Sequence, residues 1–287
     1  MRIIELFPSQ SPVFSIEIFP PKTPEGTEKL KQRLLEFKKY NPDFISVTYG
    51  AGGGTRHNTH TMASYIKNEL GIEAMAHLTC VSHTKTEIHS VLDDLEQANI
   101  ENIMALRGDP PQGETEFNKP KDGFAYASEL IAALMDREGF GIGGAGYPEG
   151  HPEAESLEKD YEYFLAKVNA GVDFIITQFF LENDFFYKWR DAMRQMGIDV
   201  PLVAGIMPAL SVEQITRFAR TCGCYVPTAL LKELARHNDD PAAMRQVGID
   251  FAQKQIEGLM QEGVDGIHLY ALNRLPAVQQ LAPLVKK

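Results

Sequence analysis

The sequence predicts an α/β fold, a closed (β/α)8 barrel of parallel strands, and three observations lead to this prediction. Short apolar runs typical of buried strands alternate with segments whose apolar residues recur at i, i+3, i+4 and i+7, the period of an amphipathic helix. Alternation of this kind implies parallel strands joined by right-handed crossovers. It continues through eight strand candidates in 287 residues, which suits a (β/α)8 barrel. A doubly wound open sheet is the structural alternative.

The first half of the chain contains four of the expected strand–helix pairs. In chain order, we expect strands at 13–20, 44–50, 73–80 and 102–109, and helices at 27–40, 59–70, 84–99 and 124–137. The third helix has the clearest start, because Thr84 and Glu87 form the T-x-x-E pattern of a capping box. A long polar loop separates the fourth strand from its helix.

The second half continues the alternation to the end of the chain. We expect strands at 141–148, 174–180, 201–208 and 266–273, and helices at 157–170, 184–196, from about 211, at 228–237, at 241–262 and at the C-terminus. The segment at 228–237 is an extra helix before the last strand. No Pro/Gly/Ser-rich linker and no break in composition divides the chain. We therefore expect residues 1–287 to form a single domain.

The composition excludes several classes of function. The chain has 44% apolar and 23% charged residues, as in soluble globular proteins, and its net charge of −11 argues against a nucleic-acid or anionic-membrane partner. It contains neither a membrane-length apolar run nor a signal-peptide pattern, so we expect a cytoplasmic protein. The cysteines Cys80, Cys222 and Cys224 are too few for a disulfide scaffold and lack zinc-like spacing, so we expect reduced thiols and no metal.

Polar residues gather at or near the carboxyl ends of the expected strands, where (β/α)8 barrels place their active sites. They come from seven of the strands and the loops that follow: Glu17, Thr48, Tyr49, His77, Thr79, Arg107, Asp109, Tyr147, His151, Gln178, Tyr270, Asn273 and Arg274. Unrelated polar residues of the core are the alternative explanation, but packing alone does not account for such a ring. The pattern indicates one functional mouth.

Two of these residues, Glu17 and His77, have specific chemical interpretations. Glu17 and Ser15 share one face of the first strand while Ile16 and Ile18 share the other, so Glu17 is buried whichever face points inward. A buried carboxylate needs a partner or a raised pKa, which makes Glu17 a candidate general acid. His77, taken alone, fits a hydrogen-bonded core histidine better than a catalytic one.

Arg107 and Asp109 also have an ordinary interpretation, as an ion pair with each other. They flank Gly108, which allows backbone N–H groups to approach a ligand.

Two glycine-rich segments match nucleotide-binding motifs only in their letters. The run at 141–146 reads G-x-G-x-x-G, but its glycines lie within an expected strand and no helix N-terminus follows, so we reject a Rossmann site. We expect these glycines to clear space for a flat ligand against the strand. The run at 50–55 lacks the Gly-Lys-Ser/Thr ending of a P-loop and is interpreted as a loop at the barrel mouth.

In the same strand-end segments the chain resembles the methylenetetrahydrofolate reductase family. The matching stretches occur in order along nearly the whole chain: SIEIFPPKT, ISVTYGAGGGTR, AHLTC, ALRGDPP, AGYPEGHPEA, ITQFF, AGIMP and LYALNR. The resemblance implies a (β/α)8 barrel that holds FAD non-covalently and uses NADH or NADPH to reduce 5,10-methylenetetrahydrofolate to 5-methyltetrahydrofolate, supplying methyl groups for methionine synthesis. It also implies a ping-pong mechanism and a homo-oligomer, a homotetramer in the bacterial members.

The resemblance assigns roles residue by residue. Glu17 matches the family's general acid, which protonates N10 of the folate, and Asp109 matches an aspartate between flavin and pterin. The positions that match FAD contacts are Thr48, His77, Arg107, Gly108, Asp109, Tyr126, Ala127, Tyr147, His151, Asp160 and Lys167. Those that match substrate contacts are Glu17, Gln178, Gln214, Phe218 and Arg274.

Other functions are compatible with the same barrel. A proline-dehydrogenase-like flavoenzyme shares the architecture but acts on an amino acid, and a non-catalytic flavin-binding module binds the cofactor without turnover. A barrel aldolase needs a Schiff-base lysine at a strand end, and the expected strand ends contain none.

Overall fold

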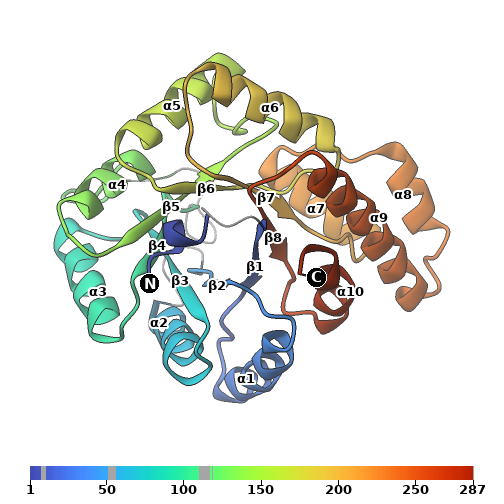
Figure 1. Cartoon of the computed structure of the whole chain (residues 1–287), viewed down its shortest axis with the longest axis horizontal. Coiled ribbons are helices and arrows are strands. Elements are labelled where there is room, and N and C mark those ends of the chain that lie inside the picture. Colours follow the sequence, from blue (N-terminus) through green and yellow to red (C-terminus); the bar gives the residue numbers. More distant parts are fainter. Residues whose placement is uncertain (8–10, 51–55, 110–116, 118, 287) are drawn as a thin grey trace.

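The computed structural model describes residues 1–7, 11–50, 56–109, 117 and 119–286. Within them, eight parallel strands form a closed barrel in chain order, with the helices arranged around it (Figure 1). Strand β1 pairs with both β2 and β8, and this double pairing closes the sheet. The predicted barrel is therefore confirmed, and the open-sheet alternative is wrong.

The strands are β1 Val13–Ile18, β2 Phe44–Val47, β3 Glu73–Thr79, β4 Asn102–Leu106, β5 Gly141–Gly146, β6 Phe174–Thr177, β7 Leu202–Ile206 and β8 Gly266–Tyr270. The α-helices are α1 Pro24–Lys38, α2 Arg56–Ser64, α3 Lys85–Gln97, α4 Ala127–Met135, α5 Leu157–Asn169, α6 Asn183–Gln195, α7 Val212–Cys222, α8 Thr228–Ala235, α9 Pro241–Gln261 and α10 Leu275–Val285. The extra helix expected at 228–237 is α8.

Some boundaries differ from the prediction for identifiable reasons. Helix α1 begins at Pro24 rather than Thr27, because the Thr23 side chain accepts a hydrogen bond from the Gly26 N–H and proline suits the first helical position. The helix expected at 59–70 is α2 followed by a π-helical turn, η3, at Tyr65–Glu69. Several strands end earlier than predicted, because the last residues of the predicted ranges belong to the loops at the barrel mouth.

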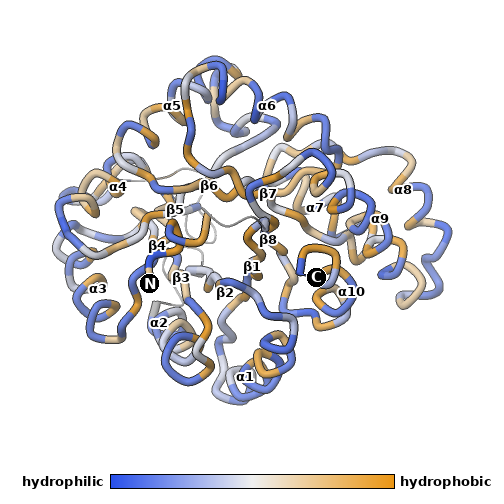
Figure 2. Tube along the Cα trace, viewed as in Figure 1, coloured by the Kyte–Doolittle hydropathy of each residue, from blue (hydrophilic) through white to orange (hydrophobic). Residues whose placement is uncertain are grey.

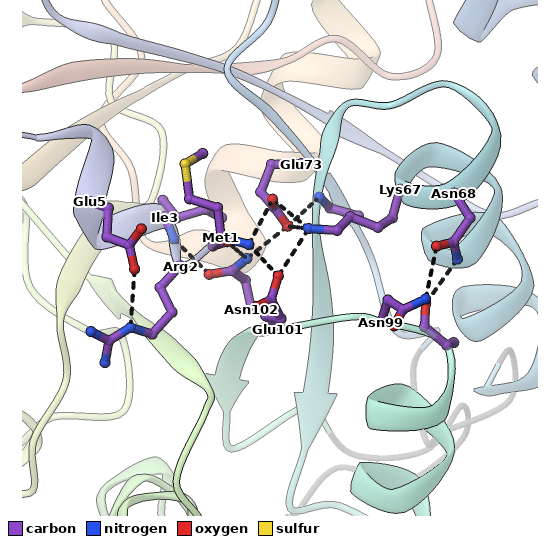
Figure 3. Close-up of polar contacts among 12 residues, drawn as sticks. Met1, Arg2, Ile3, Glu5, Lys67, Asn68, Glu73, Asn99, Glu101 and Asn102 are labelled. Carbon is purple, nitrogen blue, oxygen red and sulfur yellow. Dashed lines mark hydrogen bonds and ion pairs between the residues drawn. The ribbon is translucent and has the colours of Figure 1, made fainter.

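A short 3-10 helix that the sequence did not predict, η1 at Ile3–Leu6, closes the amino-terminal end of the barrel. Ile3 is fully buried, and its N–H donates to Asn102 Oδ1 at 2.8 Å. Around it, Lys67 bridges Glu73 and Glu101 in the network of Figure 3. Because this end is filled, a ligand of the barrel interior enters from the carboxyl ends of the strands.

Side chains alternate between the barrel interior and the helix layer as the strand pattern requires. Ile16 and Ile18 belong to the large apolar cluster between barrel and helices. In Figure 2 the tube is largely orange, the colour of hydrophobic residues, along β1 and β8. The interior near η1 is also apolar, with Phe44, Met75 and Phe174 in contact. The polar residues lie above this layer, toward the carboxyl ends. Among the described residues, no helix is both long and apolar enough to span a membrane.

Candidate active site

A buried polar cluster lies inside the barrel, where three strands contribute side chains. Glu17 from β1 is 7% exposed, and its Oε2 lies 3.4 Å from Nε2 of His77 on β3 and 3.7 Å from Nε2 of His268 on β8. Ser15 precedes Glu17 by two residues on the same face of β1, and its Oγ lies 2.7 Å from His268 Nδ1. The carboxyl group of Glu17 thus lies between two imidazoles, away from solvent.

Burial lowers the pKa of His77, and the effect of the nearby His268 acts in the same direction, while the charge of Glu17 opposes them. His77 is therefore a neutral imidazole at neutral pH, able to exchange a hydrogen bond with the carboxyl group. The sequence prediction that Glu17 and Ser15 share a buried face is confirmed, and that face is the interior one. Taken alone, His77 was interpreted as a hydrogen-bonded core histidine. The structure places it in the polar cluster, where its partner is Glu17.

His268 is a residue that the sequence interpretation missed. The strand pattern of β8 contained the signal, since His268 alternates onto the same face as Tyr270. Their rings lie edge to face, with centroids 5.0 Å apart. The Tyr270 hydroxyl donates a hydrogen bond to the Thr177 carbonyl oxygen at 2.7 Å. Gly205 leaves room for this tyrosine, because a Cβ there would lie 2.7 Å from the Tyr270 ring.

The loop after β4 carries Arg107, Gly108 and Asp109. The expected ion pair between Arg107 and Asp109 is not the principal one: the Arg107 guanidinium binds both carboxylate oxygens of Glu153, at 2.6 and 2.8 Å. Hydrogen bonding to Glu153 raises the pKa of Arg107. Gly108 has φ +86°, where glycine is favoured, and Asp109 is exposed.

The end of β5 and helix α5 contribute a second group of predicted residues. The rings of Tyr147 and His151 meet edge to face at 4.6 Å. Lys167 donates a hydrogen bond from Nζ to the Ala145 carbonyl. Burial lowers the pKa of Lys167 to about 8 and raises that of Asp160, two turns earlier on the same helix, and each charge partly offsets the shift of the other.

This lowered pKa predicts a specific pH dependence of stability. Between about pH 8 and the usual lysine value of 10.5, the unfolded chain retains a proton that folded Lys167 has released, so this group makes the free protein more stable as pH rises through that window. We expect the rise in urea midpoint from pH 8 to 10 to be smaller in Lys167→Met than in the wild type. Lys159→Met, at an exposed lysine of the same helix, is the control. Equal slopes in Lys167→Met and the wild type would contradict the assigned shift.

The expected role of the β5 glycines is wrong. A Cβ at Gly143 would lie 3.1 Å from Phe174, one at Gly144 would lie 2.9 Å from Val172, and one at Gly146 would lie 2.8 Å from Trp189. These glycines therefore make room for core side chains rather than for a flat ligand. The rejection of a Rossmann motif is confirmed, since the run forms strand β5 and α5 begins only at Leu157.

Two residues predicted to contact ligands lie directly after strands, at the barrel mouth. The Thr48 carbonyl, just after β2, accepts a hydrogen bond from Thr59 Oγ1 at 2.8 Å. Gln178, just after β6, is partly buried, and its Oε1 accepts from the Phe179 N–H at 2.9 Å.

The other predicted contacts lie on helices around the mouth. Tyr126, 60% exposed, is the N-cap residue of α4, and Ala127 begins that helix. Gln214 is in the first turn of α7, where its Oε1 accepts from the Leu210 N–H at 2.9 Å, and Phe218 is one turn further on. Arg274 is exposed at the N-cap of α10. Residues 51–55 and 110–111 of the quoted motifs lie outside the described residues.

The cysteines fit the expectation of reduced thiols. All three are free, and burial raises the pKa of Cys80 to about 12 and that of Cys222 to about 11. Thiols with such pKa values are protonated at neutral pH and are poor nucleophiles. In the described part of the chain, no three His, Cys, Asp or Glu side chains are arranged to hold a metal ion.

Comparison with known proteins gives one consistent family. The family model described as methylenetetrahydrofolate reductase matches residues 2–284. The 5,10-methylenetetrahydrofolate reductase of Escherichia coli K12 is 37% identical over 260 residues, covering 91% of this chain and 86% of the relative. Methylenetetrahydrofolate reductase (NADH) 1 of Arabidopsis thaliana is 38% identical over 271 residues, covering 91% of this chain and 46% of the relative. The chain thus spans about half the length of the plant relatives.

A solved structure supports the fold alone. It is an uncharacterized protein from Clostridium thermocellum that binds two copies of 5-methyl-5,6,7,8-tetrahydrofolic acid. It superimposes with a TM-score of 0.61 at 16% identity, covering 98% of this chain and 96% of the other.

Proposed function

The chain belongs to the methylenetetrahydrofolate reductase family, and from this we propose that it reduces 5,10-methylenetetrahydrofolate to 5-methyltetrahydrofolate with NADH and non-covalently bound FAD. The observation that carries the proposal is the carboxyl group of Glu17, buried between His77 and His268 inside the barrel. The names of the plant relatives support NADH as the electron donor.

The residues at the mouth fit a flavin dinucleotide. Arg107 and Lys167 supply positive charge for its pyrophosphate, and the buried hydroxyl of Thr79 has no hydrogen-bond partner among the described residues. We propose that FAD contacts Thr48, His77, Arg107, Gly108, Asp109, Tyr126, Ala127, Tyr147, His151, Asp160 and Lys167. Because Arg107 is bound by Glu153, its guanidinium must exchange this carboxylate for the cofactor. When bound, FAD would supply a flavin ring as the hydride carrier between the nicotinamide and the folate.

The chain's own residues prepare the folate for that hydride. Gln178, Gln214, Phe218 and Arg274 hold it, and protonated Glu17 donates its proton to N10, so that the C–N10 bond breaks and a cationic iminium forms at N5. His77 and His268 hold the Glu17 carboxyl group in place. The negative charge of Asp109 stabilises the cation.

The assembly and extent of the protein are part of the proposal. We propose that residues 1–287 form one catalytic domain, because the pairing of β1 with β8 joins the beginning of the described chain to its end. By resemblance to the bacterial members, we also propose a cytoplasmic homotetramer.

An anaerobic absorbance experiment tests the function. The purified protein, loaded with FAD, receives NADH and then methylenetetrahydrofolate. We expect the flavin absorbance to bleach with NADH and to return with the folate. A flavin that bleaches with NADH but recovers only with another acceptor would replace the folate as the proposed substrate. A flavin that bleaches with proline rather than with NADH would indicate a proline-dehydrogenase-like enzyme. A flavin that neither substrate affects would indicate a non-catalytic binding module, and a protein that binds no FAD would overturn the flavoenzyme proposal.

A further inference from the structure

Thr79 is a buried polar residue for which the described part of the chain offers no partner. It is the last residue of β3, is 4% exposed, and its Oγ1 makes no hydrogen bond to the described residues. A buried hydroxyl without a partner is costly, and native proteins rarely retain one without a reason. The sequence analysis places Thr79 among the polar residues of the barrel mouth, but the proposed set of cofactor contacts does not include it.

The position of Thr79 places this hydroxyl in the site. Strand residues two apart share a face, so Thr79 shares the interior face of β3 with His77, whose ring contacts Glu17. On the neighbouring strand, Thr79 pairs with Leu106, two residues before Gly108.

The contacts of its methyl group orient the side chain. A Cβ on Gly108 would lie 2.9 Å from Thr79 Cβ and 3.2 Å from its Cγ2, so the methyl group packs beneath the Gly108 turn. The hydroxyl is not among the atoms nearest to that turn. Thr79 therefore lies between His77 and Gly108, two of the residues proposed to contact FAD, with its methyl group against one of them.

We propose that Thr79 is a further cofactor-binding residue, whose hydroxyl donates a hydrogen bond to an oxygen of bound FAD. This inference rests on the proposed function, because it takes FAD as the ligand. The described residues give the hydroxyl no partner, and the cofactor would provide one. The competing explanation is a buried water that satisfies the hydroxyl permanently.

The two explanations predict different behaviour of Thr79→Val, which keeps the shape of the side chain and removes the hydroxyl. If FAD is the partner, the apoprotein loses an unsatisfied group, so its thermal stability stays equal or rises while FAD binds about tenfold more weakly. If a water is the partner, the apoprotein loses a satisfied hydrogen bond, so its stability falls while FAD affinity is unchanged.

The experiment measures the FAD dissociation constant by flavin fluorescence quenching on the full-length apoprotein, together with its thermal unfolding and the visible spectrum of the bound flavin. Thr79→Ser, which keeps the hydroxyl, should bind FAD like the wild type. Thr177→Val is the matched control for stability, because Thr177 Oγ1 accepts from the Gly205 N–H at 2.9 Å and its loss should destabilise the apoprotein.

The outcomes separate this inference from the proposed function. Weaker FAD binding by Thr79→Val, a flavin spectrum altered relative to Thr79→Ser, and undiminished stability support the inference. If the wild type binds FAD and Thr79→Val binds it equally well, the inference is overturned while the flavoenzyme proposal stands. If the wild type binds no FAD, both are overturned.

Discussion

Glu17→Gln is expected to reduce the rate of folate reduction by about 10²–10⁴-fold, the usual contribution of a general acid. The amide keeps the size of the side chain and its place between His77 and His268, but it has no acidic proton to give to N10. Flavin reduction by NADH needs no such proton, so its rate should be within a fewfold of the wild type. Anaerobic stopped-flow absorbance measures the two half-reactions separately.

The separation of the two rates is the decisive result. Glu25→Gln, at an exposed glutamate in the first turn of α1, is the control and should leave both half-reactions unchanged. Equal losses in both half-reactions of Glu17→Gln would indicate a disturbed flavin site and would contradict the role of Glu17 as the acid. An unchanged rate of the folate half-reaction in Glu17→Gln would mean that another residue donates the proton.

The sequence predicted the barrel and one side of its polar cluster because both depend on local periodicity. Alternation along 13–20 placed Glu17 and Ser15 on one face without any tertiary information. The same alternation along 266–273 placed His268 beside Tyr270, but a histidine within an apolar run gives no sign that a carboxylate on β1 approaches it. That contact depends on the closure of β8 onto β1, which joins residues some 250 positions apart.

Other features depended on packing that no local pattern encodes. The glycines of β5 were interpreted as room for a ligand, yet the space beside Gly146 is filled by Trp189 from α6. Arg107 pairs with Glu153 rather than with Asp109, because the loop after β5 reaches across to the loop after β4. Helix η1 was missed because its role, closing the amino-terminal end of the barrel, is visible only once the barrel exists.

Gly248→Ala is expected to destabilise the protein, although alanine is the better helix former. Gly248 lies inside α9, where the exchange would add about 1 kcal/mol of helix stability. A Cβ there would lie 1.8 Å from the Ala209 carbonyl oxygen and 2.6 Å from its carbonyl carbon. These are backbone atoms, so α9 must move, and overpacking of this kind costs about 3 kcal/mol. The cost of the clash exceeds the gain in helix propensity, and the net loss in the free energy of unfolding is about 2 kcal/mol. We therefore expect a thermal unfolding midpoint roughly 4–8 °C below that of the wild type.

The same displacement should affect substrate binding through α7. Ala209 precedes Leu210, whose N–H binds Gln214 Oε1 at the start of that helix, so a shift of this turn should raise KM for the folate more than it lowers kcat. Gly258→Ala is the matched control on the same helix. Of the described atoms, its Cβ would meet only the side-chain amide of Asn183, at 2.9 Å, and the Tyr187 hydroxyl, at 3.6 Å. A Gly248→Ala protein as stable as Gly258→Ala would mean that α9 and the Ala209 turn do not approach this closely, and the positioning of α7 by that contact would have to be abandoned.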